Sequence, residues 1–237
     1  RSTPLYSSAA SDVYKRQEIE SALDISRTTA QMFASKVNPD YPLNLTRKDA
    51  NQILRNIVDK NNFLLGIYTA WEPNKFDGKD ADYEGLPNNH PNGHFVPYWF
   101  RDTESGKLAF EPLKYYLVEG KGDYYLKPRI TKKETVVDPI NYKIGEREVL
   151  LMTLVVPILT PNQEFVGIVG TDISSESLQK LINNSTVFDG FGELSIISNN
   201  GTIVAVSKKE TLIGKNIETV FPEMSAKIKG IKGTESN

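Results

Sequence analysis

Apolar residues recur at helical spacing over the first part of the chain. From about residue 18 they return every three to four positions, with Glu, Arg and Gln between them. This pattern predicts a helix that ends before the Asn-Pro-Asp-Tyr-Pro string at 38–42, because the prolines there cannot continue it. A second amphipathic helix is predicted from Thr46, a typical N-cap residue, to about Lys60.

Two short runs rich in aromatic and branched residues follow these helices. Residues 63–71 and 95–101 are typical of strands, and the polar, Gly/Pro/Asn-rich stretch at 75–93 between them predicts a long functional loop or lid. Side chains alternate between the two faces of a strand. In the second run, one face therefore holds Phe95, Pro97, Trp99 and Arg101, and the other holds Val96, Tyr98 and Phe100.

Further strand signals lie in the second half of the chain. They predict antiparallel strands at 134–138, 148–156 and 164–171. Gln163 belongs to a tight hairpin before the last of these strands. A helix is then predicted at 174–183, with Asp172 or Ser174 as its N-cap.

The pattern starts again on a smaller scale after a polar break at 183–186. Two short strands at 193–198 and 202–207 flank Asn-Asn-Gly at 199–201, which suits a hairpin turn with positive φ. A short helix follows at 217–221. Because two strands and one short helix cannot close a sheet over a buried face, this second unit is predicted to be incomplete.

The composition is that of an ordinary globular chain. It has 237 residues, with 28 Lys and Arg against 30 Asp and Glu, so its net charge of −2 provides no general attraction to nucleic acid. The longest apolar stretch, at 149–158, is much shorter than the roughly 20 residues of a membrane-spanning helix. Residues 1–17 are rich in Ser and Ala and lack an apolar period, so they are interpreted as an artefactual or disordered tail.

Residues suited to catalysis or metal binding are scarce. Without cysteine, the chain has no disulfide, zinc thiolate or cysteine nucleophile. Its only histidines, His90 and His94, lie in a stretch broken by Pro91 and Gly93, where a helical metal pair is not expected. No Gly-x-Ser-x-Gly nucleophile motif is present in the sequence. We therefore expect no metal, no cofactor and no enzymatic activity.

Four strings are more specific than periodicity alone. The most specific, at 165–179, contains Gly-Ile-Val-Gly-Thr-Asp-Ile, and the others lie at 95–102, 136–139 and 154–158. Together they resemble the double Cache family of bacterial extracytoplasmic sensors over residues from about 18 to 223. The resemblance implies an α+β fold, in which a long N-terminal helix precedes PAS-like lobes of antiparallel sheet.

The resemblance also implies a domain organisation and a location. Stalk helices are expected at 18–60, a membrane-distal ligand-binding lobe at 61–186, and the truncated start of a membrane-proximal lobe at 187–237. The domain is expected outside the cytoplasmic membrane, as part of a membrane-anchored receptor that homodimerises through its N-terminal helix. The favoured parent is a methyl-accepting chemotaxis protein, and a sensor histidine kinase or diguanylate cyclase is the alternative.

The chain only partly matches the residues with which this family binds α-amino acids. The matching positions are Trp99, Phe100, Asp138 and Asp172. The usual basic position is Pro97 and the usual Tyr position is Val136, so the donor that clamps an α-carboxylate is missing there. Arg101, two residues after Trp99, is the candidate to replace it.

The other aromatic, amide and carboxylate groups suit a small planar ligand. Flat aromatic walls with hydrogen-bonding edges favour a purine or pyrimidine base, with an amine, an amino acid or a short carboxylate as alternatives. We expect Trp71 and Trp99 to face one shared hollow, and the tyrosines at 115–125 to lie mainly on the outer surface. The candidate ligand-binding residues are Tyr68, Trp71, Glu72, Asn74, Trp99, Phe100, Arg101, Tyr125, Asp138 and Asp172.

Three classes of function are compatible with these residues. The favoured one is a non-catalytic sensor, in which a ligand closes the distal lobe and shifts the N-terminal helix. The second is a hydrolase or lyase that uses Glu72 with Asp172 or Asp138 as acid and base. The third is a structural or adhesion module without a small ligand.

Overall fold

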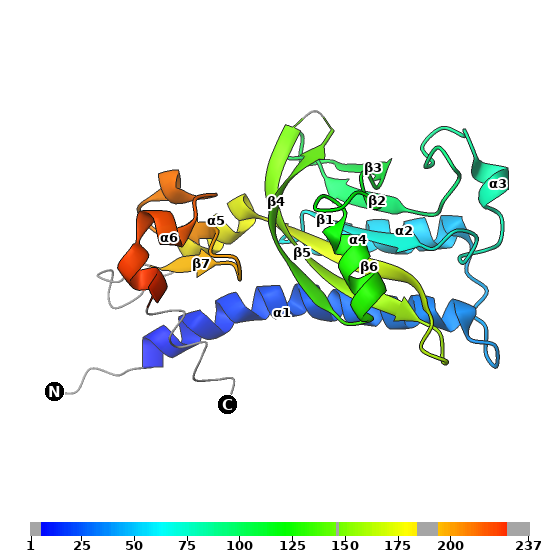
Figure 1. The fold of residues 1–237 in the computed structure, drawn as a ribbon, viewed down its shortest axis with the longest axis horizontal. Coiled ribbons are helices and arrows are strands. Elements are labelled where there is room, and N and C mark those ends of the chain that lie inside the picture. The colour runs from blue at the N-terminus through cyan, green and yellow to red at the C-terminus, as the bar shows by residue number, and fades with distance from the viewer. Residues whose placement is uncertain (1–5, 146, 184–193, 227–237) are drawn as a thin grey trace.

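The computed structural model describes residues 6–145, 147–183 and 194–226 (Figure 1). Helix α1 (Tyr6–Ala34) is long and passes along both a large lobe and a small lobe. It begins at Tyr6, ahead of the start near residue 18 that the apolar pattern predicted. Alanine is the best helix former, and this Ala-containing stretch extends the helix although its apolar pattern is irregular.

A six-stranded antiparallel sheet forms the large lobe, in the order β3-β2-β1-β6-β5-β4. The strands are β1 (Gly66–Trp71), β2 (Pro97–Arg101), β3 (Leu108–Pro112), β4 (Thr135–Ile144), β5 (Arg147–Leu159) and β6 (Phe165–Ser174). The expected α+β architecture is therefore confirmed. Strand β3 was not predicted, and the hairpin before β6 contains Gln163 with a φ of 63°, as expected for a tight turn.

Helices cover both faces of this sheet (Figure 1). One face packs against α1 and α2 (Arg47–Lys60), and we call it the α1/α2 face; the other packs against α4 (Asp123–Thr131), and we call it the α4 face. Thr46 caps α2 as predicted, because its side chain accepts a hydrogen bond from the Asp49 amide while the Asp49 carboxylate accepts one from the Thr46 amide.

The alternation predicted for β2 is confirmed. Tyr98 and Phe100 join the core on the α4 face, whereas Trp99 packs against the core on the α1/α2 face. All six residues of β1, which lies between β2 and β6, are buried. The sheet is therefore buried on both sides, and a polar group on either face is shielded from water.

The remaining elements complete the large lobe, connect the two lobes or form the small one (Figure 1). Ser174 caps α5 (Ser175–Asn183), since its side chain accepts from the Ser177 amide, while Asp172 is turned to the α4 face. Most of the expected polar break, at 184–186, lies outside the described residues. The other elements are η1 (Ser35–Val37), α3 (Asp80–Tyr83), β7 (Ser195–Ile197), β8 (Ile203–Val206), η3 (Glu210–Leu212) and α6 (Ile217–Val220).

None of the helices in the described part of the chain is both long enough and apolar enough to cross a membrane.

Candidate ligand-binding site

Asp172 is an unusual charged group because it is buried at the centre of the large lobe. It is 4% exposed, and its Oδ1 has no hydrogen-bond partner among the described residues. Burial raises the pKa of this carboxyl group from 3.8 to about 7, against the opposing effect of the nearby Thr153 and Tyr98 hydroxyls. Such a group costs folding free energy, so it is a candidate for a functional role.

Tyrosine rings surround this carboxylate. Tyr68 lies edge-on to Tyr98 and Tyr124, with ring centroids 5.9 and 5.5 Å apart. Tyr142 lies edge-on to the same two rings, at 6.2 and 6.3 Å. These rings come from β1, β2, β4 and α4 and are at most 7% exposed. We define the tyrosine cage as Asp172, Tyr68, Tyr98, Tyr124, Tyr142 and Thr153.

Hydrogen bonds satisfy part of the cage and leave specific atoms unpaired. The Tyr68 hydroxyl and Thr153 Oγ1 are 2.6 Å apart, and the Tyr124 hydroxyl donates to the Lys114 carbonyl at 2.6 Å. The buried Tyr98 hydroxyl and Asp172 Oδ1 form no hydrogen bond of good geometry with a described residue, although the hydroxyl lies near enough to Asp172 to lower the pKa of its carboxyl group. Buried polar atoms are usually paired, so these two atoms mark the place where a ligand could supply hydrogen bonds.

Glu111 adds a second carboxylate to the α4 face. It pairs with Tyr98 across β2 and β3, and its Oε2 accepts from the Lys114 ammonium at 2.8 Å. Its Oε1 is buried without a hydrogen-bond partner in the described structure. Burial raises the pKa of the Tyr142 phenol, and the negative charges of Asp172 and Glu111 raise it further. The Tyr142 phenol therefore interacts electrostatically with both carboxylates.

Two glycines make room for the rings of the cage. A Cβ atom on Gly66 would lie 2.5 Å from the ring of Tyr98, and a Cβ atom on Gly170 would overlap the ring of Tyr68. Gly170 is the second glycine of the Gly-Ile-Val-Gly-Thr-Asp string that carries the family resemblance. The string therefore places an aromatic ring directly over the strand that bears Asp172.

Replacing Gly170 with Ala is expected to displace Tyr68 and to destabilise the domain by about 1–3 kcal/mol, the usual cost of overpacking a core. The free energy of unfolding in urea measures this effect. Adding Tyr68→Leu should relieve the clash, so the double variant should cost less than the sum of the two single variants. Strict additivity would show that the ring does not rest on Gly170.

In this conformation the cage is closed. The cavity lined by the cage residues other than Tyr98, together with Leu113, Ile140 and Leu151, has a volume of only about 10 Å³. That volume barely admits a water molecule, so a ligand can enter only if the cage opens. Tyr124 lies on α4 and Tyr142 on β4, which makes these two elements the walls that must move.

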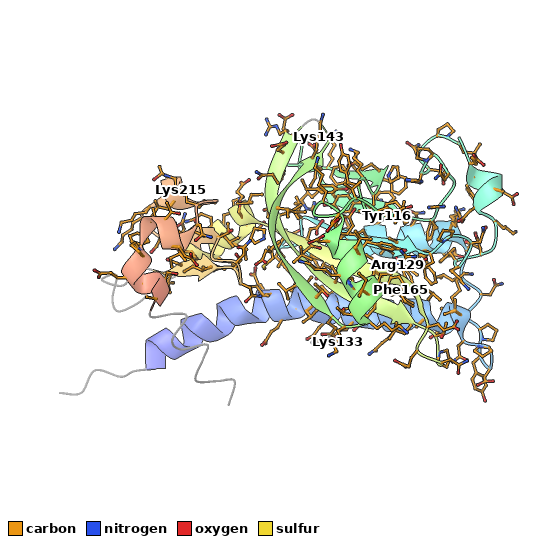
Figure 2. The ribbon with its side chains drawn as sticks, in the orientation of Figure 1. Tyr116, Arg129, Lys133, Lys143, Phe165 and Lys215 are labelled. Atoms are coloured by element: carbon orange, nitrogen blue, oxygen red, sulfur yellow. The ribbon has the colours of Figure 1, made fainter. Side chains whose placement is uncertain are left out.

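Two predicted residues, Glu72 and Tyr125, hold α4 against the sheet and lie beside the cage. The Tyr125 hydroxyl donates to a Glu72 carboxylate oxygen, and Arg129 Nε forms an ion pair with Glu72 at 2.7 Å. The Tyr125 ring packs edge-on against Tyr116, which precedes α4, at 5.2 Å. Figure 2 shows Tyr116 and Arg129 in the region of α4. These contacts give Glu72 and Tyr125 a positioning role.

The two tryptophans do not share a hollow, which corrects that expectation. Trp71 is 1% exposed and packs against Phe33 and Phe76 on the α1/α2 face, at 6.4 and 5.0 Å. Trp99 lies further along this face, where its Nε1 donates to Asn51 at 2.8 Å. The helices α1 and α2 fill the space that the sequence pattern left open.

Three other predicted residues have local structural partners. The Arg101 guanidinium donates to the Val58 carbonyl at 2.9 Å, at the end of α2 on the face opposite to the cage. Asn74 exchanges hydrogen bonds with Asp80 in a turn. Asp138 accepts from the Asn200 amide of the small lobe at 3.0 Å. The structure brings none of these three into the cage.

Tyr68, Phe100, Tyr125 and Asp172 are thus the predicted residues that belong to the α4 face, where Phe100 packs against Tyr98 at 5.2 Å. Of these, Tyr68 and Asp172 belong to the cage. Sequence reasoning missed Tyr98, Glu111, Tyr124, Tyr142 and Thr153. The expectation that the tyrosines at 115–125 lie outside is wrong for Tyr116, Tyr124 and Tyr125, which are 1–3% exposed. The alternation of β2, which opposes Tyr98 to Trp99, was a signal that could have found part of the cage.

Comparison with known proteins identifies related domains. The family of methyl-accepting chemotaxis protein-like first PDC sensor domains matches residues 50–180. Methyl-accepting chemotaxis protein TlpQ of Pseudomonas aeruginosa is 27% identical over 194 residues, which cover 77% of this chain and 27% of TlpQ. PscA of Pseudomonas syringae pv. tomato is 39% identical over 79 residues, which cover 33% of this chain and 12% of PscA. The chain thus spans about a quarter or less of the length of these curated relatives.

Solved structures show the same fold. The extracellular domain of the histidine kinase mmHK1S-Z3 is 30% identical, with a TM-score of 0.79, and the alignment covers 94% of this chain and 76% of that one. The periplasmic sensory domain of the Campylobacter jejuni chemoreceptor Tlp1 is 14% identical, with a TM-score of 0.64 and coverages of 91% and 75%.

Proposed function

Because the chain belongs to the family of methyl-accepting chemotaxis protein-like first PDC sensor domains, we propose that it is the domain with which a chemoreceptor binds a small organic cation. Its relatives are periplasmic or extracellular sensor domains of membrane chemoreceptors and kinases, which places this domain outside the cytoplasmic membrane. The observation that carries the ligand class is the buried carboxyl group of Asp172 inside the tyrosine cage, whose Oδ1 has no hydrogen-bond partner among the described residues.

An ammonium group matches the chemistry of the cage. Its positive charge would balance the buried negative charge of Asp172, and its N–H groups can donate to Asp172 Oδ1. The faces of tyrosine rings attract a desolvated cation. Glu111 lies outside the closed cavity beside Tyr98, and its Oε1 is buried without a partner in the described structure. An opened cage would therefore offer a second acceptor, which favours a ligand with an N–H donor at each end, such as a short diamine.

The cage suits a base or an α-amino acid less well. The hypothesis of a purine or pyrimidine rested on a hollow shared by Trp71 and Trp99, and Trp71 is enclosed in the core of the other face. An α-amino acid needs a cation for its carboxylate, yet the described residues that line the cage cavity include no Lys or Arg. Arg101, the proposed substitute, caps α2 instead. The amine is therefore the favoured alternative.

Contacts on the back of β6 connect the cage to α1. Thr171, next to Asp172, faces α1, and its Oγ1 donates to the Ala22 carbonyl at 3.0 Å. Ser26 of α1 lies 3.0 Å from the same Oγ1 and donates to the Leu154 carbonyl of β5. A ligand that shifts β6 would therefore act on α1 through buried hydrogen bonds. Such coupling is typically worth about 1–3 kcal/mol.

Calorimetric titration at pH 7.5 with four kinds of probe tests the ligand class. We expect saturable binding of 1,4-diaminobutane, weaker binding of 1-aminobutane, which has a single ammonium group, and no heat from adenine or succinate. Saturable binding of adenine alone would restore the base hypothesis. A folded domain that binds neither amine would contradict the proposal.

The affinity for 1,4-diaminobutane is expected to depend on pH, because only ionised Asp172 can pair with an ammonium group. With its pKa raised to about 7, affinity should rise about tenfold per pH unit between pH 5 and 7 and level off above. The free energy of unfolding of the ligand-free domain should change with pH in the opposite direction and fall as the pH rises. A folded pKa raised from 3.8 contributes stability that is fully present below pH 3.8 and lost as the pH rises through 7.

Titrations at pH 5, 6, 7 and 8 measure this dependence. Below pH 7, binding of the ammonium group should release the proton of Asp172 to the buffer. The observed binding enthalpy should therefore vary with the ionisation enthalpy of the buffer. An affinity that stays constant from pH 5 to 8 would show that a group other than Asp172 pairs with the ligand.

A further inference from the structure

A second cavity lies outside the tyrosine cage. Its volume is about 300 Å³, and it is bounded by α2, β2, β3 and the loop that follows α3. We call it the lateral pocket. Its aromatic lining consists of Tyr83, Phe95, Trp99 and Phe110, and its polar lining includes Lys48 and His90.

Buried ion pairs fix the loop that forms one wall of this pocket. Arg47 is 5% exposed and forms ion pairs with Asp77 at 2.9 Å and Asp80 at 2.6 Å. It also donates to the Gly93 carbonyl at 2.7 Å, and its guanidinium stacks 4.0 Å from the centroid of the Tyr83 ring. The loop is therefore anchored to α2, so the pocket is present before any ligand binds.

Hydrogen-bond donors face this pocket without competing carboxylates. Its lining, as far as the described residues form it, contains no Asp or Glu. Lys48 is exposed on α2 and lines the pocket. His90 Nδ1 accepts from the Asn92 amide at 3.3 Å, and burial lowers the pKa of the ring. The neutral ring therefore carries its proton on Nε2, where it can donate to a ligand.

The aromatic part of the pocket is fixed in orientation. Trp99 is half-buried, and its Nε1 donates to Asn51, whose amide in turn donates to the Arg47 carbonyl at 2.9 Å. The Phe110 ring lies 5.2 Å from the Trp99 ring, tilted by 40°. Rigid aromatic walls of this kind favour a flat, conjugated ligand over a flexible one.

We propose that the lateral pocket is a second binding site, which takes a planar aromatic carboxylate. The ring of the ligand packs against Trp99 and Phe110, and its carboxylate accepts from the Lys48 ammonium and the His90 Nε2–H. The two sites of the large lobe thus select ligands of opposite charge. The tyrosine cage binds a cation, and the lateral pocket binds an anion on the other side of β2.

Calorimetric titration of the whole chain with indole-3-carboxylate tests this site. Indole-3-carboxamide is the neutral control of the same shape, and acetate is the charged control without a ring. We expect saturable binding of indole-3-carboxylate, about fivefold weaker binding of the carboxamide, and none of acetate at the same concentrations.

Matched variants locate the site. Lys48→Gln should weaken indole-3-carboxylate about fivefold and Phe110→Ala about tenfold, whereas Lys60→Gln, also exposed on α2, should have no effect. Neither Lys48 nor Phe110 is buried, and circular dichroism melting confirms that each variant folds. Asp172→Asn should leave this binding unchanged, which separates the lateral pocket from the amine site.

Three results would overturn the proposal. A folded domain that gives no heat with millimolar indole-3-carboxylate has no such site. Equal affinity for the carboxamide would show that the pocket does not recognise the negative charge. Loss of binding in Asp172→Asn, with no change in Lys48→Gln, would place the aromatic ligand in the tyrosine cage.

Discussion

Replacing Asp172 with Asn is expected to lower the affinity for 1,4-diaminobutane by at least about 100-fold, the usual cost of removing one partner of a buried charge pair. The amide keeps the shape of the side chain and removes the charge that the ammonium requires. The large lobe should remain folded, because the native carboxylate has no counter-ion among the described residues that line the cage. Calorimetry and thermal unfolding at pH 7.5 measure the two effects.

Asp138→Asn is the matched control for this experiment. This substitution replaces the same carboxylate with the same amide in the same lobe. The Asp138 side chain, however, accepts from the Asn200 amide and lies outside the cage. The affinity of the Asp138→Asn variant for 1,4-diaminobutane should therefore equal that of the native domain. If Asp172→Asn also binds the diamine with native affinity, the cage does not hold the ammonium group.

Replacing Arg47 with Ala is expected to destabilise the domain by about 3–5 kcal/mol, the cost of breaking a buried ion pair by removing one partner. The substitution leaves Asp80, which is 5% exposed, without its guanidinium partner. It also releases the Gly93 carbonyl and the loop around it. Urea unfolding measures the change in free energy.

Arg55→Ala provides the comparison, since Arg55 lies exposed on the same helix. Its cost should stay within about 0.5 kcal/mol, as for ordinary surface substitutions. The folded fraction of Arg47→Ala should still bind 1,4-diaminobutane and should lose indole-3-carboxylate. A loss of less than about 1 kcal/mol in Arg47→Ala would show that the ion pairs do not anchor the loop.

Local signals in the sequence were sufficient for most of the fold. Thr46 and Asp49 form the predicted helix start, and Gln163 adopts the positive φ of the predicted hairpin. The alternation of β2 correctly separated Tyr98 from Trp99. These features depend on residues that are close together in the chain, so a short window of sequence contains the information.

The candidate site could be predicted only in part, for a physical reason. Tyrosine has both an apolar ring and a polar hydroxyl, so its residue type does not decide between a surface and a core position. Tyr124 became part of the cage because α4 packs on the sheet beside Tyr68 and Tyr98. Trp71 became a core residue because α1 and α2 cover the opposite face. Neither fact is contained in the local pattern.

The sequence by itself determined the family, the order of most strands and helices, and the presence of Asp172 near the end of a buried strand. Only the tertiary structure decided which face of the sheet that carboxylate occupies and which rings surround it. Strands β1, β2, β4, β5 and β6 and helix α4 all contribute to the cage, and contacts between such distant segments depend on packing across the whole lobe. The ligand class proposed above rests on these long-range contacts, because the same residues spread over two faces would not form one site.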